Sequence, residues 1–457
     1  MRRGLPPGAA AAARRRLDLM PVAGRSVGGA LAAILGREGL REDDAARAAA
    51  SVDGEVPRWV ARPATPEQVS GVLALAHDAG LAVAPRGSGS ALELGRPPAR
   101  VDVVLDLGGL DRVLDWSPDD LTVSVQAGVS AGALATRLAG RRQLLPLDPP
   151  GAATRTLGGL TATAASGPLR ARYGTLRDLL LGVRFVQADG VVTWGGARVV
   201  KSVSGYDVPK LMIGALGTLG VLVELTLRLH PTPEAERTWL VRVRDVAEAQ
   251  AVVDALLDSA IQPNRVELLN GAALGAAGLP AGAAAVAVSV GTVAAAVRAQ
   301  GEALAALARR VGGEAVPQPA DFWDRYGRAG ALGGGVRLRV ATLVTGLAAA
   351  LGELDAAAAD LAPGVAARVT GCAAVGALHV ALAPIAPEAA AALVERLRGF
   401  VAPAGGSVVV EAGPRALREA LDPWGPVAPG PLGLMRALKD EFDPARVLNP
   451  GRFVGGL

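Results

Sequence analysis

The chain has 457 residues, of which 51% are hydrophobic and 20% are charged, so it is too apolar to be an intrinsically disordered protein. Its 47 basic and 43 acidic residues are scattered and only 3% of its residues are aromatic, which argues against a nucleic-acid-binding surface. Its only cysteine, Cys372, excludes an intramolecular disulfide and an iron-sulfur cluster built by this chain alone.

Residues 1–27 are predicted to form a cationic tail. Arginines occur at its start and again at 14–16, but the alanines between them are too few for the apolar core of about 7 to 15 residues that a signal peptide needs. Residues 27–51 then favour short helices.

A β-α-β unit follows this tail. Residues 58–61 are predicted to form a short apolar strand, and the capping box Thr65-Pro66-Glu67-Gln68 opens a helix that Gly80 ends. The second strand, 81–85, leads directly into the loop Arg86-Gly87-Ser88-Gly89-Ser90.

The loop 86–90 has the composition of an anion-binding loop. Glycine permits positive φ and has no Cβ, so successive backbone N–H groups can converge on a phosphate. The loop is not a Walker A motif, because no Gly-Lys-Ser/Thr follows, and it is not a Rossmann fingerprint, because it does not open a helix. The pattern alone leaves two alternatives open, a pyrophosphate-binding loop and a plain surface turn.

The next part of the chain predicts more strands and a domain boundary. Strands are predicted at 101–107, 121–126, 184–187, 191–194 and 221–229, with a helix over 130–139. Between them lies a run of small residues, 156–167, which could lie against a flat ring system or could be a tightly packed Ala-rich segment. Pro231-Thr232-Pro233 then interrupts the pattern and predicts a domain boundary.

The region 232–410 repeats one pattern twice. Strands are predicted at 239–243, 264–269, 284–290, 336–342, 366–371, 376–383 and 407–411, and helices at 246–258, 292–310, 346–360 and 387–399. This predicts a sheet covered by helices on one face. The longest uncharged stretch, 268–297, contains Pro280 and many Ala and Gly, so we interpret it as a loop, a strand and a helix start rather than as a membrane span.

Each of the three histidines has a structural explanation. His77 lies in the last turn of the helix after Thr65, where it complements the helix dipole, and His230 ends a strand before Pro231. His379 lies in an apolar strand and is predicted to be a core residue. No Ser-His-Asp or metal-ligand spacing is present, so no metal site is predicted.

Several segments together resemble the FAD-linked oxidases of the vanillyl-alcohol oxidase and p-cresol methylhydroxylase type. These segments are 85–90, 147–167, 172–190, 195–231 and 439–453. Within that family, VVKSVSGYDVPKL and the C-terminal LNPGRF are most similar to the FAD-binding subunits of glycolate oxidases. The resemblance covers the middle of the chain only in outline.

The resemblance implies an α+β fold with a two-subdomain FAD-binding domain. That domain would comprise residues 28–231, with an inserted cap or substrate domain over 232–410 and a C-terminal return over 411–457. The cap would then cover the reactive face of the flavin.

The resemblance also implies which residues bind FAD. Arg86, Gly87, Ser88, Gly89 and Ser90 would hold the pyrophosphate. The other implied FAD-binding residues are Gly158, Gly159, Thr161, Ser166, Gly167, Tyr173, Gly174, Val221 and Asn449. Many relatives attach FAD covalently through a histidine near the first glycine loop, but 85–95 contains none, so we expect non-covalent FAD. Relatives often have Asn where this chain has Ser202.

The substrate site is less well defined by the sequence. Oxidation of an alcohol carbon by hydride transfer requires a group that accepts the hydroxyl proton, and a substrate carboxylate requires an arginine or a metal. Arg325 is the first candidate for the carboxylate, although it could equally be a surface arginine beside Trp323. The other candidates are Tyr326, Arg328, Arg337 and Arg339. The histidine-rich motifs of the family's D-2-hydroxy-acid dehydrogenases are absent from 408–413.

The resemblance therefore implies the FAD-binding subunit of a glycolate-oxidase-like complex that oxidises a small 2-hydroxy acid. Its partners would be an iron-sulfur subunit and a second flavoprotein, because this chain has too few cysteines to hold a cluster. We expect a cytoplasmic protein, peripheral to the inner membrane only through such partners. Two alternatives stay open, a self-sufficient FAD-dependent dehydrogenase or oxidase and a non-catalytic FAD-binding relay subunit.

Overall fold

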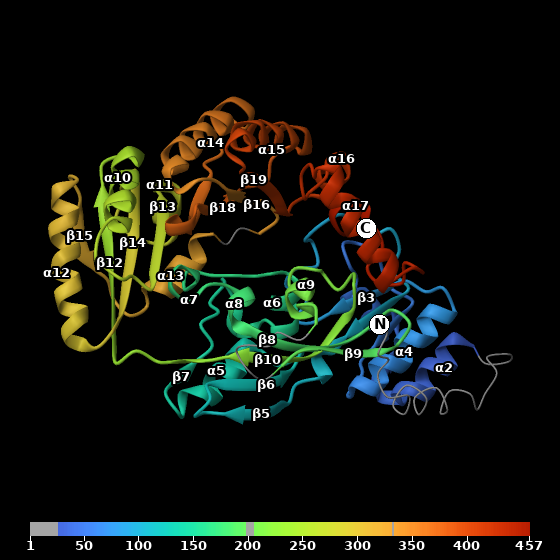
Figure 1. Cartoon of the computed structure of the whole chain (residues 1–457). Coiled ribbons are helices and arrows are strands. Elements are labelled where there is room, and N and C mark those ends of the chain that lie inside the picture. The colour runs from blue at the N-terminus through green and yellow to red at the C-terminus, as the bar shows by residue number, and fades with distance from the viewer. Residues whose placement is uncertain (1–25, 198–204, 331–332) are drawn as a thin grey trace.

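The computed structural model describes residues 26–197, 205–330 and 333–457 (Figure 1). Most of the predicted tail, together with Lys201 and Ser202, lies outside the described residues. Two smaller sheets with their helices form the lower part of Figure 1, and a larger sheet with its own helices lies above them. The predicted α+β class is confirmed.

The first sheet carries the glycine loop at the end of one of its strands. Its strand order is β1 (Leu40–Arg41), β2 (Trp59–Ala61), β4 (Val103–Asp106) and β3 (Val83–Arg86). β2 and β3 both pair in parallel with β4, so the predicted β-α-β unit has β4 between its two strands. Helix α4 (Pro66–Asp78) connects them, and the Thr65 side chain accepts a hydrogen bond from the Gln68 N–H at 3.3 Å, as expected for its N-cap. Helices α2 (Val27–Leu35) and α3 (Asp44–Ala49) precede this unit.

The second sheet is antiparallel. Its order is β5 (Val113–Ser117), β6 (Thr122–Gln126), β10 (Val221–Arg228), β8 (Leu180–Val186) and β9 (Val192–Gly196). Helices α5 (Ala131–Ala139) and α6 (Leu157–Ala162) pack on it through a shared apolar core around Phe185. The short helix α6 begins at Thr156, whose side chain accepts a hydrogen bond from the Gly159 N–H at 3.2 Å. The run of small residues is therefore helical over 157–162 and forms a turn and irregular chain over 163–167.

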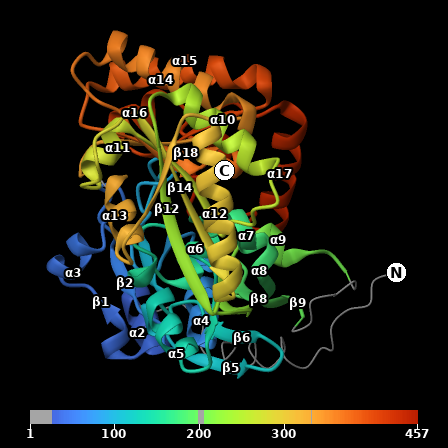
Figure 2. The same cartoon turned by 90° about the vertical axis from the view of Figure 1, so that its left-hand side faces the viewer.

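The third sheet, which we call the cap sheet, has eight antiparallel strands, all between Ala235 and Ala412. The strand order is β15 (Glu314–Pro317), β12 (Ala235–Val243), β14 (Ala284–Thr292), β13 (Arg265–Asn270), β17 (Arg368–Cys372), β18 (Ala377–Leu382), β16 (Val336–Ala341) and β19 (Ser407–Ala412). One face is covered by the four long helices α10 (Val246–Leu257), α12 (Ala294–Arg310), α14 (Leu347–Leu361) and α15 (Pro387–Val401). Figure 2 shows the cap sheet above the two smaller sheets.

The opposite face of the cap sheet carries two helices that the sequence analysis does not predict. They are α11 (Gly271–Ala276) and α13 (Phe322–Ala329), and they form a separate apolar cluster with residues of β12, β13 and β14. The buried residues of α13 are Phe322, Tyr326 and Ala329, which recur at helical spacing. The stretch 268–297 contains the end of β13, α11, β14 and the start of α12. Among the described residues, no helix is long and apolar enough to cross a membrane.

The last part of the chain returns to the first sheet. The Val83 N–H donates to the Val447 carbonyl at 2.7 Å, and the Asn449 N–H donates to the Val83 carbonyl at 2.9 Å. Helix α17 (Pro429–Phe442) carries the buried Lys439, which donates to the Thr218 carbonyl at 2.8 Å and pairs with Asp443 at 2.6 Å. This return places residues 449–452 beside the glycine loop. The domain boundaries at 27, 231 and 410 stay predictions.

Candidate functional site

Three neighbouring cavities run from the glycine loop to the cap sheet. The smallest, about 50 Å³, lies between Gly87, Gly158 and Val221. The next, about 80 Å³, is lined by residues 85–92 and by Asn449 and Arg452. The third, about 470 Å³, lies between the small-residue run and the cap sheet, and we call it the cap cavity. Adjacent cavities share lining residues. These are Pro85, Gly87, Thr156, Gly159 and Ala162 for the first two, and Ser90, Ala91, Arg155 and Thr163 for the second and third.

The glycine loop has the backbone features that an anion-binding loop needs. A Cβ on Gly87 would lie 2.1 Å from the Thr156 Oγ1, so no side chain fits there. Gly89 has φ +79°, which residues other than glycine rarely adopt. The Nε atoms of Arg86, Arg155 and Arg452 are buried, and within the described part of the chain they have no hydrogen-bond partner. Bare backbone and buried Nε–H donors without a partner fit a pyrophosphate.

Most of the FAD-binding residues predicted from the sequence line these cavities. Arg86 to Ser90 and Asn449 line the middle one, Gly158 and Val221 the smallest, and Gly159 both of these. Ser166 and Gly167 line the cap cavity. Asn449 donates from Nδ2 to the Leu216 carbonyl at 2.6 Å.

Three predicted residues lie elsewhere. Thr161 is fully buried and donates to the Leu157 carbonyl at 2.8 Å, within α6. Tyr173 packs edge-on against His230, with ring centroids 4.9 Å apart. Gly174 is next to it with φ +78°. None of the three lines a cavity described above, so their contact with FAD stays a prediction.

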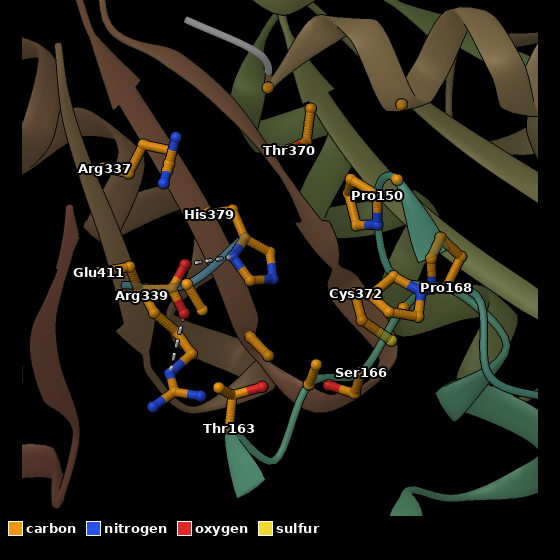
Figure 3. Close-up of a pocket in the computed structure, with 18 of the residues that line it drawn as sticks. Pro150, Thr163, Ser166, Pro168, Arg337, Arg339, Thr370, Cys372, His379 and Glu411 are labelled. Carbon is orange, nitrogen blue, oxygen red and sulfur yellow. Dashed lines mark ion pairs between the residues drawn. The ribbon is translucent and has the colours of Figure 1, made fainter. Parts of the chain in front are cut away.

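The floor of the cap cavity is one face of the cap sheet. His379 on β18 lies directly opposite Arg339 on β16 and opposite Thr370 on β17. Directly opposite residues point to the same face of a sheet, so these three side chains form one row across three strands. Leu378 and Val380, the neighbours of His379 along the strand, point to the helix-covered face. Figure 3 shows the row with Glu411 of β19 beside it.

An acidic side chain and two arginines gather around His379. The His379 Nδ1 lies 3.6 Å from Glu411 Oε2, and the Arg339 Nε lies 3.7 Å from Glu411 Oε1 (Figure 3). Burial alone would raise the pKa of Glu411, but the interaction with His379, including the charge of its protonated form, and the charges of Arg339 and Arg337 bring it to about 2. Glu411 is therefore ionised at neutral pH and can hold a proton on His379 Nδ1.

The prediction that His379 is a core residue is wrong. Its side chain is 41% exposed and lines the cap cavity. The reason is the alternation of the strand, which places Leu378 and Val380 in the apolar core and His379 on the other face.

Arg337 and Arg155 complete the cationic end of the cap cavity. Arg337 lies two residues before Arg339 on β16, and its guanidinium group has no hydrogen-bond partner within the described part of the chain. Burial lowers the pKa of Arg155, and the positive charge of Arg337 lowers it further. The negative charge of Glu411 acts in the opposite direction. Arg155 comes from the lower half of the molecule, so both halves contribute cations to one anion-binding region.

Arg325, the first candidate from the sequence, lies outside this region. Its Nε pairs with Asp321 Oδ2 at 2.9 Å, one helical turn earlier on α13, and it does not line the cap cavity. Tyr326, the next residue, does line it. The structure thus favours Arg337 and Arg339 over Arg325. Among the described residues, no three His, Cys, Asp or Glu side chains are placed to hold a metal ion.

Two family models match the chain. The FAD binding domain matches residues 57–196, and the C-terminal domain of FAD linked oxidases matches residues 232–453. The chain belongs to the FAD-linked oxidases. FAD as the cofactor is thereby confirmed, and the family resemblance seen in the sequence is correct.

Curated relatives match about half of this FAD-linked oxidase. A mitochondrial D-lactate dehydrogenase [cytochrome] of Arabidopsis thaliana is 35% identical over 216 residues, which are 47% of this chain and 38% of the relative. The glycolate oxidase subunit GlcD of Bacillus subtilis is 28% identical over 242 residues, 52% of each chain. The chain thus spans about half the length, or less, of these relatives.

Solved structures extend the similarity to nearly the whole chain. The p-cresol methylhydroxylase structure with substrate bound has a TM-score of 0.76 at 18% identity and covers 93% of this chain and 96% of that one. A 4-ethylphenol oxidase of Gulosibacter chungangensis has a TM-score of 0.73 at 15% identity, with 98% of both chains covered. At such identities the likeness establishes the fold, which is that of a two-domain FAD-linked oxidase.

The structure supports one prediction about this cofactor, namely that FAD is released on mild acid or heat denaturation. Among the described residues that line the three cavities, the only histidine is His379. It is paired with Glu411. Burial and the nearby Glu267 raise the pKa of Cys372 to about 12, so its thiol stays protonated and unreactive. Flavin absorbance should appear in the supernatant after precipitation. Yellow protein in the pellet would show a covalent bond.

Proposed function

We propose that this protein is an FAD-dependent oxidoreductase that oxidises a small 2-hydroxy acid. We further propose that it is a subunit that passes the electrons to an iron-sulfur partner, with a second flavoprotein in the complex. The observation that carries the first proposal is the cationic end of the cap cavity, where a histidine paired with a carboxylate lies next to arginines of both halves of the molecule.

The arginines suit the carboxylate of the substrate. Arg337 and Arg339 project from alternate positions of β16, and Arg155 faces them from the lower half of the molecule. Because a guanidinium group binds a carboxylate through two parallel hydrogen bonds, such a cluster fixes the orientation of the acid as well as its position. The carbon that bears the hydroxyl group would then lie over His379.

His379 suits the hydroxyl proton. With Nδ1 held by Glu411, its Nε2 is left to accept that proton, and the negative charge of Glu411 stabilises the imidazolium ion that forms. FAD, when bound, accepts the hydride from the same carbon. The walls of the cavity include Pro150, Pro168 and Cys372 (Figure 3).

The need for partners rests on two kinds of support. The chain has one cysteine and so cannot build an iron-sulfur cluster, and one of its relatives carries the name of a glycolate oxidase subunit. The sequence analysis assigned each histidine a structural role, whereas the structure places His379 beside Glu411 in the cap cavity. That observation favours the self-sufficient FAD-dependent dehydrogenase as the second candidate function.

Anaerobic titration of the purified FAD-loaded chain tests the proposed oxidation. Glycolate or D-lactate should lower the flavin absorbance to about the level of reduced FAD. Succinate, which has no hydroxyl group, should leave the absorbance unchanged. A flavin that stays oxidised with every 2-hydroxy acid would contradict the proposal and favour a relay subunit.

Steady-state turnover tests the need for a partner. The isolated chain should turn over slowly with an artificial acceptor, and addition of the iron-sulfur partner from the native source should raise the rate. Turnover of the isolated chain at ordinary enzyme rates, on the order of 1 to 10³ s⁻¹, would instead establish the self-sufficient dehydrogenase.

A further inference from the structure

A second polar group lines the cap cavity away from the arginines. Glu267 is 2% exposed and points to the cavity face of β13, while its neighbours Val266 and Leu268 point to the helix-covered face. The Tyr326 hydroxyl group on α13 donates a hydrogen bond to its Oε2. Its Oε1 is buried and has no hydrogen-bond partner among the described residues. One carboxyl oxygen is thus held in place and the other is free for a ligand.

The register of the cap sheet places Glu267 at a defined distance from the arginines. Glu267 lies opposite Cys372 on β17, one row along from the row of Arg339, His379 and Thr370. β13 is two strands from β18 and three from β16, which correspond to roughly 10 and 14 Å at about 4.8 Å per strand. A molecule whose carboxylate lies at Arg339 and whose C2 lies over His379 would therefore extend its tail across Thr370 toward Glu267.

The protonation state of Glu267 decides what it can recognise. Burial raises the pKa of Glu267 to about 8, although the hydrogen bond from Tyr326 lowers it. At neutral pH the carboxyl group is therefore mostly protonated and can donate a hydrogen bond as well as accept one. The Cys372 thiol, a weak donor, lies opposite it and Leu269 is its apolar neighbour on this face, while the Tyr326 hydroxyl group is already bonded to Oε2. A ligand group is therefore the natural partner for Oε1.

We propose that Glu267 and Tyr326 form a second polar subsite, which binds an uncharged hydroxyl or carbonyl oxygen on the tail of the substrate. The preferred substrate is then a 2-hydroxy acid with an oxygen-bearing tail rather than an alkyl tail. This inference rests on the proposed function, because that function places the carboxylate and C2 of the substrate at the other end of the cavity.

The distribution of charge favours an uncharged tail over a second carboxylate. Arg155, Arg337 and Arg339 lie at the far end of the cavity. Arg170, whose charge slightly lowers the pKa of Glu267, is bonded to Ser166, to whose Oγ it donates at 3.1 Å. A carboxylate beside Glu267 would lack a cation of its own in a buried site.

Binding of acids that cannot be oxidised at C2 tests the subsite directly. Titration calorimetry of the FAD-loaded protein would compare 6-hydroxyhexanoate with heptanoate, which has the same length and a methyl group in place of the hydroxyl group. We expect 6-hydroxyhexanoate to bind about tenfold tighter or more, because a site built to hydrogen-bond a hydroxyl group rejects the analogue that lacks it. Equal binding of the two acids, or tighter binding of heptanedioate than of either, would overturn the proposal.

Variants locate the preference at Glu267. Glu267→Leu should abolish the preference for the hydroxyl group, and Glu267→Gln should retain part of it. Tyr326→Phe should reduce the difference in affinity between the two acids. Glu388→Gln, at an exposed glutamate on the helix-covered side of the cap sheet, is the matched control and should bind as the wild-type protein does. A Glu267→Leu protein that keeps the full preference would contradict the assignment. The comparison of the two acids on the wild-type protein needs no variant, so it still tests the proposal if a variant protein fails to fold.

Flavin reduction separates this inference from the proposed function. 2,6-Dihydroxyhexanoate and 2-hydroxyheptanoate differ by a hydroxyl group in place of the terminal methyl group, and 2,6-dihydroxyhexanoate should reduce the flavin at lower concentration. If both acids reduce it equally well, the subsite is wrong and the proposed function stands. If neither reduces it while 6-hydroxyhexanoate still binds more tightly than heptanoate, the subsite stands and the proposed oxidation is wrong.

Discussion

Gly87→Val is expected to yield a protein that does not retain FAD. A Cβ at this position would lie 2.1 Å from the Thr156 Oγ1, the atom that accepts the Gly159 N–H at the start of α6. Valine would therefore displace Thr156, uncap α6 and fill the space where the two smaller cavities join. The ratio of flavin to protein absorbance after gel filtration measures the effect. A hundredfold excess of ligand over its Kd contributes about 2.7 kcal/mol to folding, so Tm should also fall.

Gly89→Val should have a similar effect through the backbone. Gly89 has φ +79°, and a left-handed conformation costs a residue with a Cβ roughly 1 to 2 kcal/mol. Gly405→Val is the matched control, because Gly405 has φ +74°, nothing lies within 4 Å of its added Cβ, and it follows α15 on the cap sheet. Full flavin occupancy in both loop variants would show that 86–90 is only a surface turn.

His379→Gln is expected to slow flavin reduction by about 10² to 10⁴, the usual contribution of a general base. FAD occupancy should not change, because His379 lines the cap cavity and neither of the two smaller ones. Stopped-flow absorbance under anaerobic conditions measures the rate. Glu411→Gln should slow the same step less, since the base remains and only the charge that stabilises its protonated form is lost.

A second histidine provides the control for this prediction. His77→Gln changes a residue in the last turn of α4, far along the chain from the cap sheet, and should leave the rate of flavin reduction unchanged. If His379→Gln reduces its flavin as fast as the wild-type protein, another group must accept the hydroxyl proton, and the proposed role of His379 is wrong.

The glycine loop could be found from the sequence because its chemistry lies in consecutive residues. Arg86 to Ser90 are contiguous, and glycine at these positions already implies positive φ or a close approach of the backbone. The elements around the loop were predicted correctly for the same reason, since a capping box and an apolar strand are local patterns. Tyr173 and Gly174 were assigned by resemblance alone, and the structure places them outside the cavities.

The cap cavity could not be predicted in this way, because it depends on the register of several strands. Arg339, His379 and Thr370 become neighbours only when β16, β18 and β17 pair, and no local pattern gives that pairing. One signal was present and was overlooked. His379 alternates with Leu378 and Val380, so its side chain had to point to the face opposite the apolar core.

The pairing of the C-terminal return with β3 sets the time at which this protein can acquire its cofactor during synthesis. Arg452 donates to the Leu92 carbonyl across 360 residues of chain, and together with Asn449 it lines the cavity of the glycine loop. At about 5 to 20 residues per second, the ribosome synthesises Asn449 and Arg452 roughly 20 to 70 s after the glycine loop on the other side of the cavity. A nascent chain therefore exposes a half-built flavin site for that interval, and stable FAD loading has to wait until residue 452 has emerged.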